Sequence, residues 1–327
     1  MPFAIYGGFV VLVLVLVLLD LGVLTRSAHV IGTREALLRT SGWVSLALGF
    51  NVFIYFLYGH DWFDWKEVSG HSLAGGDAAA QFFAGYLLEQ SLSVDNMMVI
   101  AIIFGFYRIP AINQHRVLLW GILGALVLRG IMIALGAVLI QSFTWVVYVF
   151  GAFLIVTAAK LLVAKEGEVH PERNLLFKIA RRLYPISPTL DGDRFFTRVA
   201  DGRRAMTPMF LALILVETSD VIFAVDSIPA IFAVTSDPFL VFTSNVFAIL
   251  GLRSLYFALA GMLEKFRFLK TSLVFVLAFV GVKMILSHHF HIATWIALLI
   301  IGGILAIGII ASLVIPEPET GHEHAAE

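Results

Sequence analysis

Six acidic residues lie within segments of this chain that are otherwise almost wholly apolar. They are Asp20, Glu89, Asp95, Glu217, Asp220 and Asp226. An ionised carboxylate deep in a lipid bilayer is costly unless it is paired, protonated or facing a water-filled cavity, so such residues are candidates for function. Asp20 lies near the end of its segment and can reach the membrane surface, which favours a structural role. We expect the other five to bind a ligand or to exchange protons.

Two basic residues, Arg129 and Arg253, lie equally deep in apolar segments. Guanidinium groups pair with carboxylates in a bidentate geometry, so we expect both arginines to contact the acids. Five deep carboxylates minus two arginines leave a formal surplus of three negative charges, which favours a bound cation over an anion. Further oxygen donors lie beside the acids: Ser91, Ser93, Asn96, Thr218, Ser219 and Ser227. This set suits hard or borderline divalent ions such as Mn²⁺, Mg²⁺ or Ca²⁺.

Helical geometry restricts which acids can share one ion. On a continuous helix Glu217 and Asp226, nine residues apart, point in opposite directions and lie about 13.5 Å apart along the axis. Pro229 lacks a backbone N–H, so a break over residues 226–229 could turn Asp226 inward and expose carbonyl oxygens. A simple proline kink is the alternative. In the earlier segment Glu89 and Asn96 share a face with Ser93, whereas Asp95 points about 120° away and could meet the second set of acids.

The composition indicates where these residues must lie. Of 327 residues, 60% are hydrophobic and only 14% are charged, and the mean hydropathy is +0.93. These values nearly exclude a water-soluble globular enzyme and predict an all-α, polytopic membrane protein embedded in the lipid bilayer. The net charge of -1 gives no basic surplus for nucleic acid, and the absence of cysteine excludes thiolate metal sites.

Nine membrane spans follow from a length of about 20 apolar residues for each crossing. They cover residues 3–24, 41–58, 78–105, 117–139, 145–164, 207–234, 241–262, 270–287 and 292–314. Seventeen Lys and Arg residues fall in four alternate connecting segments, and the others hold only Lys66. The positive-inside bias then predicts a multi-pass protein of the cytoplasmic (inner) membrane, with its N-terminus outside and its C-terminus in the cytoplasm.

An internal repeat relates two groups of three spans. The sequences around the arginines are LRGIMIALGA and LRSLYFALAG, and each arginine is followed 31 or 30 residues later by a lysine, Lys160 or Lys283. Because each unit has an odd number of crossings, the second copy is inverted, as in many secondary transporters. Chance similarity of apolar segments is the alternative. The predicted organisation is two N-terminal helices (1–77), a first repeat (78–164), a cytoplasmic segment (165–206), a second repeat (207–290), a final helix (291–315) and a disordered tail (316–327).

The cytoplasmic segment, residues 165–206, contains two local signals. Apolar residues recur at helical spacing between basic ones over residues 173–183, which is typical of a helix lying on the membrane surface. Asp201 and Gly202 separate two short β-prone runs, which predicts a hairpin with a two-residue turn. A solvated linker is the alternative, and this segment could also bind protein partners.

The chain resembles the TerC family of integral membrane proteins, in its Alx branch. The matching motifs are EQSLSVDN (89–96), DGRRAMTPMF (201–210) and VETSDVIFAVDSIPAI (216–231), and the resemblance covers roughly residues 10–315. It implies a metal-ion transporter, foremost a manganese exporter, linked to tellurium resistance and to the metalation of exported enzymes. Carried over to this chain, the acidic motif positions of the family fall on Glu89, Asp95, Asn96, Glu217, Asp220 and Asp226.

Two other classes of function are alternatives to transport. Paired intramembrane aspartates can cleave peptide bonds, but the usual Gly-x-Gly-Asp pattern is absent from the spans and no His-Glu-x-x-His motif occurs. A membrane adaptor that acts in tellurium or metal stress, or in metalation, through residues 165–206 is the second class.

The sequence thus predicts a non-enzymatic transporter without a resident cofactor, in which a divalent cation binds between the two repeats and exchanges for protons. The expected ligands are Glu89, Asp95, Asn96, Glu217, Asp220 and Asp226. Ser91, Ser93, Ser219, Ser227, Arg129 and Arg253 are expected to support them, with Pro229 as a hinge.

Overall fold

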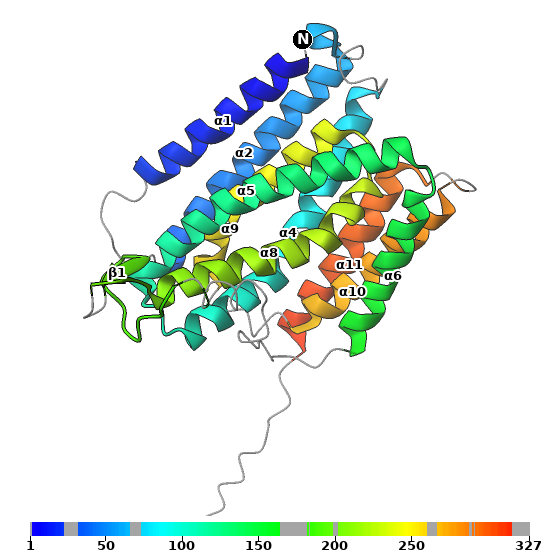
Figure 1. Ribbon diagram of the computed structural model, residues 1–327. Coiled ribbons are helices and arrows are strands. Elements are labelled where there is room, and N and C mark those ends of the chain that lie inside the picture. Colours follow the sequence, from blue (N-terminus) through cyan, green and yellow to red (C-terminus); the bar gives the residue numbers. More distant parts are fainter. Residues whose placement is uncertain are drawn as a thin grey trace, which may run out of the picture.

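The computed structural model describes most of the chain as long α-helices (Figure 1). It describes residues 2–22, 32–65, 73–163, 182, 184–198, 202–259, 267–287, 290 and 292–315. Its α-helices are α1 (Pro2–Gly22), α2 (Thr33–Gly59), α4 (Gly75–Phe106), α5 (Ala111–Ser142), α6 (Val146–Val163), α8 (Pro208–Phe232), α9 (Pro238–Leu259), α10 (Arg267–Leu286) and α11 (Thr294–Val314). A short 3₁₀ helix, η1 (Trp62–Asp64), follows α2.

The described helices confirm an all-α polytopic membrane protein. Eight of them, all except α1, are long and apolar enough to cross a membrane, and α1 contains a shorter apolar stretch over residues 5–19. The predicted spans match these helices within a few residues, apart from α2 and α5, which begin eight and six residues before their predicted spans. In the first turns of α2, Arg39 and Glu35, one turn apart, form an ion pair at 2.5 Å that adds to the stability of this end of the helix.

Among the described membrane helices α9 is the most enclosed, because 83% of its apolar stretch is buried inside the protein. It packs against α2, α4 and α5, while α1 contacts it through aromatic rings. The ring centroid of Phe9 lies 5.6 Å from that of Phe242 and 6.0 Å from that of Phe247. The N-terminus of α9 is capped by the buried Asp237, whose carboxylate accepts a hydrogen bond from the Phe239 N–H at 2.9 Å. A fixed, shielded α9 can therefore present side chains to its neighbours at defined positions.

A second group of helices, α6, α10 and α11, lies together at one side of the molecule (Figure 1). Helices α6 and α10 approach each other closely, since a Cβ on Gly151 would lie 2.9 Å from the carbonyl oxygen of Gly281. A Cβ on Gly308 of α11 would lie 1.9 Å from the Ser272 hydroxyl of α10. Small residues thus bring the backbones of these helices together, as is usual between membrane helices.

The two predicted three-helix units correspond to α4–α6 and α8–α10, and their helices interleave. Helices α4 and α5 each pack against both α8 and α9, and α6 packs against α10. Residues of both units therefore meet in the centre of the molecule. The inverted relation between the units stays a prediction.

Part of the predicted cytoplasmic segment forms a small β-hairpin. Strands β1 (Phe196–Arg198) and β2 (Arg204–Met206) pair antiparallel, with Arg198 opposite Arg204. Five residues, 199–203, lie between this last pair. A two-residue turn at Asp201-Gly202 would place Arg198 opposite Ala205 instead, so that predicted turn is wrong. Gly202 has a φ of +80°, the backbone conformation that glycine favours in such a turn. The predicted membrane-surface helix over residues 173–183 lies largely outside the described part of the chain.

The hairpin packs onto the end of the helix bundle. Met206 is fully buried in a cluster with residues of α4, α5 and α8, and Arg116 of α5 pairs with Asp193. The Asn113 side-chain amide also donates to the Gly192 carbonyl at 3.0 Å. The hairpin and the first turns of α5 therefore form one packed surface.

Candidate functional site

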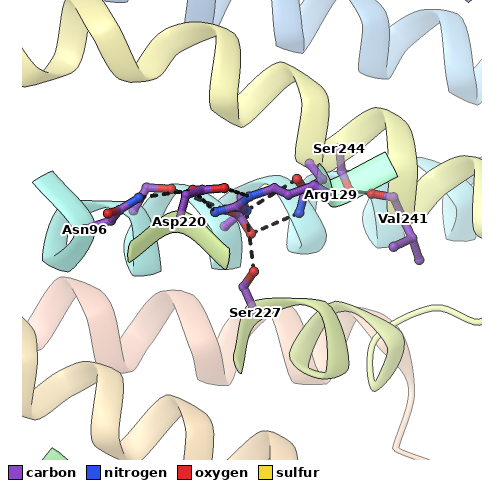
Figure 2. Close-up of polar contacts among 9 residues, drawn as sticks. Asn96, Arg129, Asp220, Ser227, Val241 and Ser244 are labelled. Atoms are coloured by element: carbon purple, nitrogen blue, oxygen red, sulfur yellow. Dashed lines mark hydrogen bonds and ion pairs between the residues drawn. The ribbon is translucent and has the colours of Figure 1, made fainter. Parts of the chain in front are cut away.

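The centre of the molecule holds one buried guanidinium group between two carboxylates. Arg129 of α5 is 2% exposed and pairs with Glu89 of α4 through Nη1. It also donates two hydrogen bonds to Asp220 of α8 from one edge of the guanidinium, Nε to Oδ2 at 3.0 Å and Nη2 to Oδ1 at 2.7 Å (Figure 2). The predicted pairing of this deep arginine with deep acids is observed, and it joins one acid from each predicted repeat.

Neutral polar groups complete a ring around these charges. The Asn245 side-chain amide of α9 donates to Glu89 Oε2 at 3.1 Å, and the Asn96 amide of α4 donates to Asp220 Oδ1 at 3.2 Å. Ser227 and Ser93 make longer contacts, 3.5 Å to Arg129 and 3.4 Å to Glu89. We call Glu89, Ser93, Asn96, Arg129, Asp220, Ser227 and Asn245 the Arg129 ring. Such charge-assisted bonds offset part of the cost of burying three ions.

The ring adjoins a small, partly open cavity of about 30 Å³. Its polar lining comes from Ser93, Asn96, Asp220 and Arg253, and the rest is apolar apart from Tyr256. Asn96 is 2% exposed, and its Oδ1 accepts no hydrogen bond from the described residues. This space is enough for about one or two water molecules or a partly dehydrated ion.

Glu217 lies beside the ring, three residues before Asp220 on α8, and is close enough for the two carboxylates to interact electrostatically. Its carboxylate lies against Gly124 of α5, where a Cβ would be 2.0 Å from Oε1. The Oε2 atom is buried and has no hydrogen-bond partner among the described residues. Glu217 is thus next to the centre without being bonded into it.

One of the expected ligands, Asp226, lies apart from the ring. Asp226 is half-buried and accepts a hydrogen bond from the Thr157 hydroxyl of α6 at 3.0 Å, near Lys160. Asp95 is also half-buried and directly precedes Asn96 on α4, so its role as a ligand stays a prediction. The structure therefore brings together Glu89, Asn96 and Asp220, with Glu217 adjacent, and leaves Asp226 elsewhere.

The expected break in α8 is absent, because this helix runs continuously from Pro208 to Phe232. Pro229 lies in its last turn, where the missing N–H removes only one bond, and its own carbonyl still accepts from the Ala233 N–H at 3.0 Å. Asp226 consequently stays on the side of α8 opposite to Glu217. The role of Pro229 as a hinge stays a prediction.

The remaining expected residues have different surroundings. The Ser91 hydroxyl donates to its own helix at the Leu87 carbonyl, and Ser219 is half-buried. Arg253 is buried and lines the cavity. Within the described residues, no group of three or more His, Asp or Glu side chains is already arranged to hold a metal ion.

Asn245 and Gly124 are the residues that the sequence analysis missed. The polar run Thr243-Ser244-Asn245 inside an apolar span was a signal for Asn245. Gly124 had no such signal, because its importance comes from a side chain on another helix.

Comparison with known proteins agrees with the motifs. Residues 74–320 match the model of the integral membrane protein TerC family. A membrane protein of Myxococcus xanthus, STKORF319, is 49% identical over 309 residues, which cover 94% of this chain and 92% of the relative. An Escherichia coli K12 protein whose name proposes a membrane-bound redox modulator, Alx, is 44% identical over 92% of both chains. No solved structure shows significant similarity. The chain therefore belongs to the TerC family of integral membrane proteins.

Proposed function

We propose that this protein is a secondary transporter that exports a divalent metal cation, with Mn²⁺ as the ion that its site favours, in exchange for protons. The observation that carries this proposal is the Arg129 ring, in which Glu89 and Asp220 from two different helices share one buried cation. In the structure that cation is the guanidinium group of Arg129. A transported ion has to take its place.

Competition between Arg129 and the ion gives the site its mechanism. Breaking a buried ion pair without replacement costs about 3–5 kcal/mol, so Arg129 gives up a carboxylate only when another positive charge arrives. Asn96 Oδ1 and Glu217 Oε2, both buried without a hydrogen-bond partner among the described residues, are oxygen donors that such an ion could use. Binding therefore requires a rearrangement of the ring rather than entry into a finished site.

The donor set favours a hard or borderline ion. Carboxylate, amide and hydroxyl oxygens suit Mn²⁺, Mg²⁺ and Ca²⁺. Met97, which is 1% exposed and lines the cavity beside Asn96, adds one soft sulfur atom that would favour Mn²⁺ over Mg²⁺. Because carboxylates must be deprotonated to bind metal, proton release accompanies ion binding, which accounts for the proposed exchange.

The cavity agrees with loading from the hairpin side of the molecule. It is lined by residues from the C-terminal halves of α4 and α9 and the N-terminal halves of α5 and α8. The β-hairpin packs at these same helix ends. In our proposal this side faces the cytoplasm, because the Lys and Arg residues in 165–204 follow the positive-inside bias. Loading from this side then corresponds to export.

The name of the Alx relatives suggests a second role, in redox modulation. The present sequence contains no cysteine, so it offers no thiol for disulfide exchange. A redox effect of this chain would then act through the metal ions that it moves.

The proposal is tested by following Mn²⁺ flux into liposomes that contain the purified full-length protein, with and without a pH gradient. We expect flux that rises when protons are supplied on the opposite side of the membrane, and a loss of at least about tenfold in Asp220→Asn. The matched control is Asp193→Asn, which removes an acid paired with an arginine at the exposed hairpin and should keep full flux. No flux in the unmodified protein, or full flux in Asp220→Asn, contradicts the proposal.

A further inference from the structure

A notch in α5 holds the carboxylate of Glu217. At Gly124, a Cβ would lie 2.0 Å from Oε1, 2.4 Å from the carboxyl carbon and 2.4 Å from Oε2 of Glu217. All three atoms of the carboxyl group thus occupy the space that any side chain at position 124 would fill. The notch exists only because the residue there is glycine.

The notch lies close to the Arg129 ring on both helices that form it. Gly124 is five residues before Arg129 on α5, and Glu217 is three residues before Asp220 on α8. Residues three apart on a helix are neighbours, so rotation of the Glu217 side chain can bring its carboxylate beside Asp220. Only side-chain torsions need to change for this movement.

Two buried oxygen atoms indicate that a ligand position beside Asp220 is incomplete. Asn96 Oδ1 and Glu217 Oε2 are shielded from solvent and accept no hydrogen bond from the described residues. An unsatisfied buried acceptor is destabilising, and native proteins seldom keep one without a functional reason. Asn96, 2% exposed, lines the cavity with Asp220 and already donates to its carboxylate.

We propose that Gly124 is a positioning residue that holds Glu217 outside the ion site, and that Glu217 leaves the notch to become the third carboxylate ligand, with Glu89 and Asp220. The inference rests on the proposed function and adds the moving ligand to it. When Arg129 releases its carboxylates, Glu217 joins them around the divalent ion. When the ion leaves, Glu217 returns to Gly124 and Arg129 closes the ring.

Gly124→Ala is a direct test, because the added methyl group collides with the end of a flexible side chain rather than with backbone. Alanine also has a higher helix propensity than glycine, so the substitution does not weaken α5 itself. The variant should force Glu217 out of the notch and towards Asp220. Gly130→Ala is the matched control on the same helix, since a Cβ there meets only Phe242 at an ordinary 3.5 Å.

The measurements are Mn²⁺ affinity of the purified full-length protein, by calorimetric titration, and Mn²⁺ flux in liposomes. We expect Gly124→Ala to bind Mn²⁺ at least about threefold more tightly and to transport it at least about tenfold more slowly. Gly130→Ala should match the unmodified protein. Adding Glu217→Asp, which shortens the side chain by one methylene, should restore part of the lost flux in Gly124→Ala.

The outcomes separate this inference from the function on which it rests. If the unmodified protein neither binds nor moves Mn²⁺, both fail. If it moves Mn²⁺ but Gly124→Ala behaves like Gly130→Ala, or is folded and binds Mn²⁺ more weakly, only the role of Gly124 fails. Should Gly124→Ala not fold, the double variant decides: restored folding with tighter binding supports the proposal, and continued misfolding overturns it.

Discussion

Helix α8 carries acidic residues to two places that differ in how their charge is compensated. On one side Asp220 makes two bonds to Arg129 and one to Asn96 within a fully buried ring. On the other side Asp226 is half-buried and accepts one hydrogen bond, from Thr157 of α6. A carboxylate within a membrane helix is therefore not evidence of one shared site. Its partner decides whether it belongs to a rigid centre or to a looser helix contact.

The largest effect is expected from removing the shared cation of the ring. Arg129→Gln leaves Glu89 and Asp220 buried without their counter-charge, which should lower the free energy of unfolding by about 3–5 kcal/mol. Thermal unfolding of the purified protein in detergent measures this. Asp226→Asn is the comparison and should cost about 1 kcal/mol, since it weakens a single hydrogen bond. Equal losses in the two variants would show that the ring has no special stability.

An intermediate effect is expected where α6 meets α10. Gly151→Ala places a methyl group 2.7 Å from the Ile285 side chain and 2.9 Å from the Gly281 carbonyl oxygen. Backbone cannot move aside cheaply, so we expect about 1–3 kcal/mol of destabilisation, by the same unfolding measurement. Gly303→Ala on α11 is its control, because open space surrounds that position and stability should not fall. A stable Gly151→Ala protein would mean that α6 shifts freely against α10.

The smallest effect is expected at the contact between α6 and α8. Thr157→Val keeps the shape of the side chain but removes the hydroxyl that donates a hydrogen bond to Asp226. This should lower the free energy of unfolding by about 0.5–1.5 kcal/mol. Mn²⁺ flux should stay within about twofold of the unmodified protein, since the Arg129 ring is untouched. A tenfold loss of flux would place Asp226 in the ion path, as the sequence predicted, and would remove the distinction between the two sides of α8.

Most of the fold could be predicted because lipid imposes a simple rule of length and hydropathy on each span. The pairing of Arg129 with acids was also predictable, since a guanidinium in mid-membrane has few other partners. The rotation of each helix about its axis was not, because it depends on neighbours that a single chain does not identify. For this reason the sequence alone groups Asp226 with Glu89 and Asp220, although Asp226 contacts Thr157 of α6 instead. Gly124 shows the same limit, since only the contact with Glu217 makes it more than one of 27 glycines.

The fork of Arg129 has one further consequence. Its nitrogen atoms reach α4 and α8 at once while its own backbone belongs to α5, and its contact with Asn245 reaches α9. No two of the helices that share this residue can part without stranding an anion or a dipole in a medium that solvates neither. If the protein transports a metal ion as proposed, we expect the helices to separate only when that ion replaces Arg129 between the carboxylates.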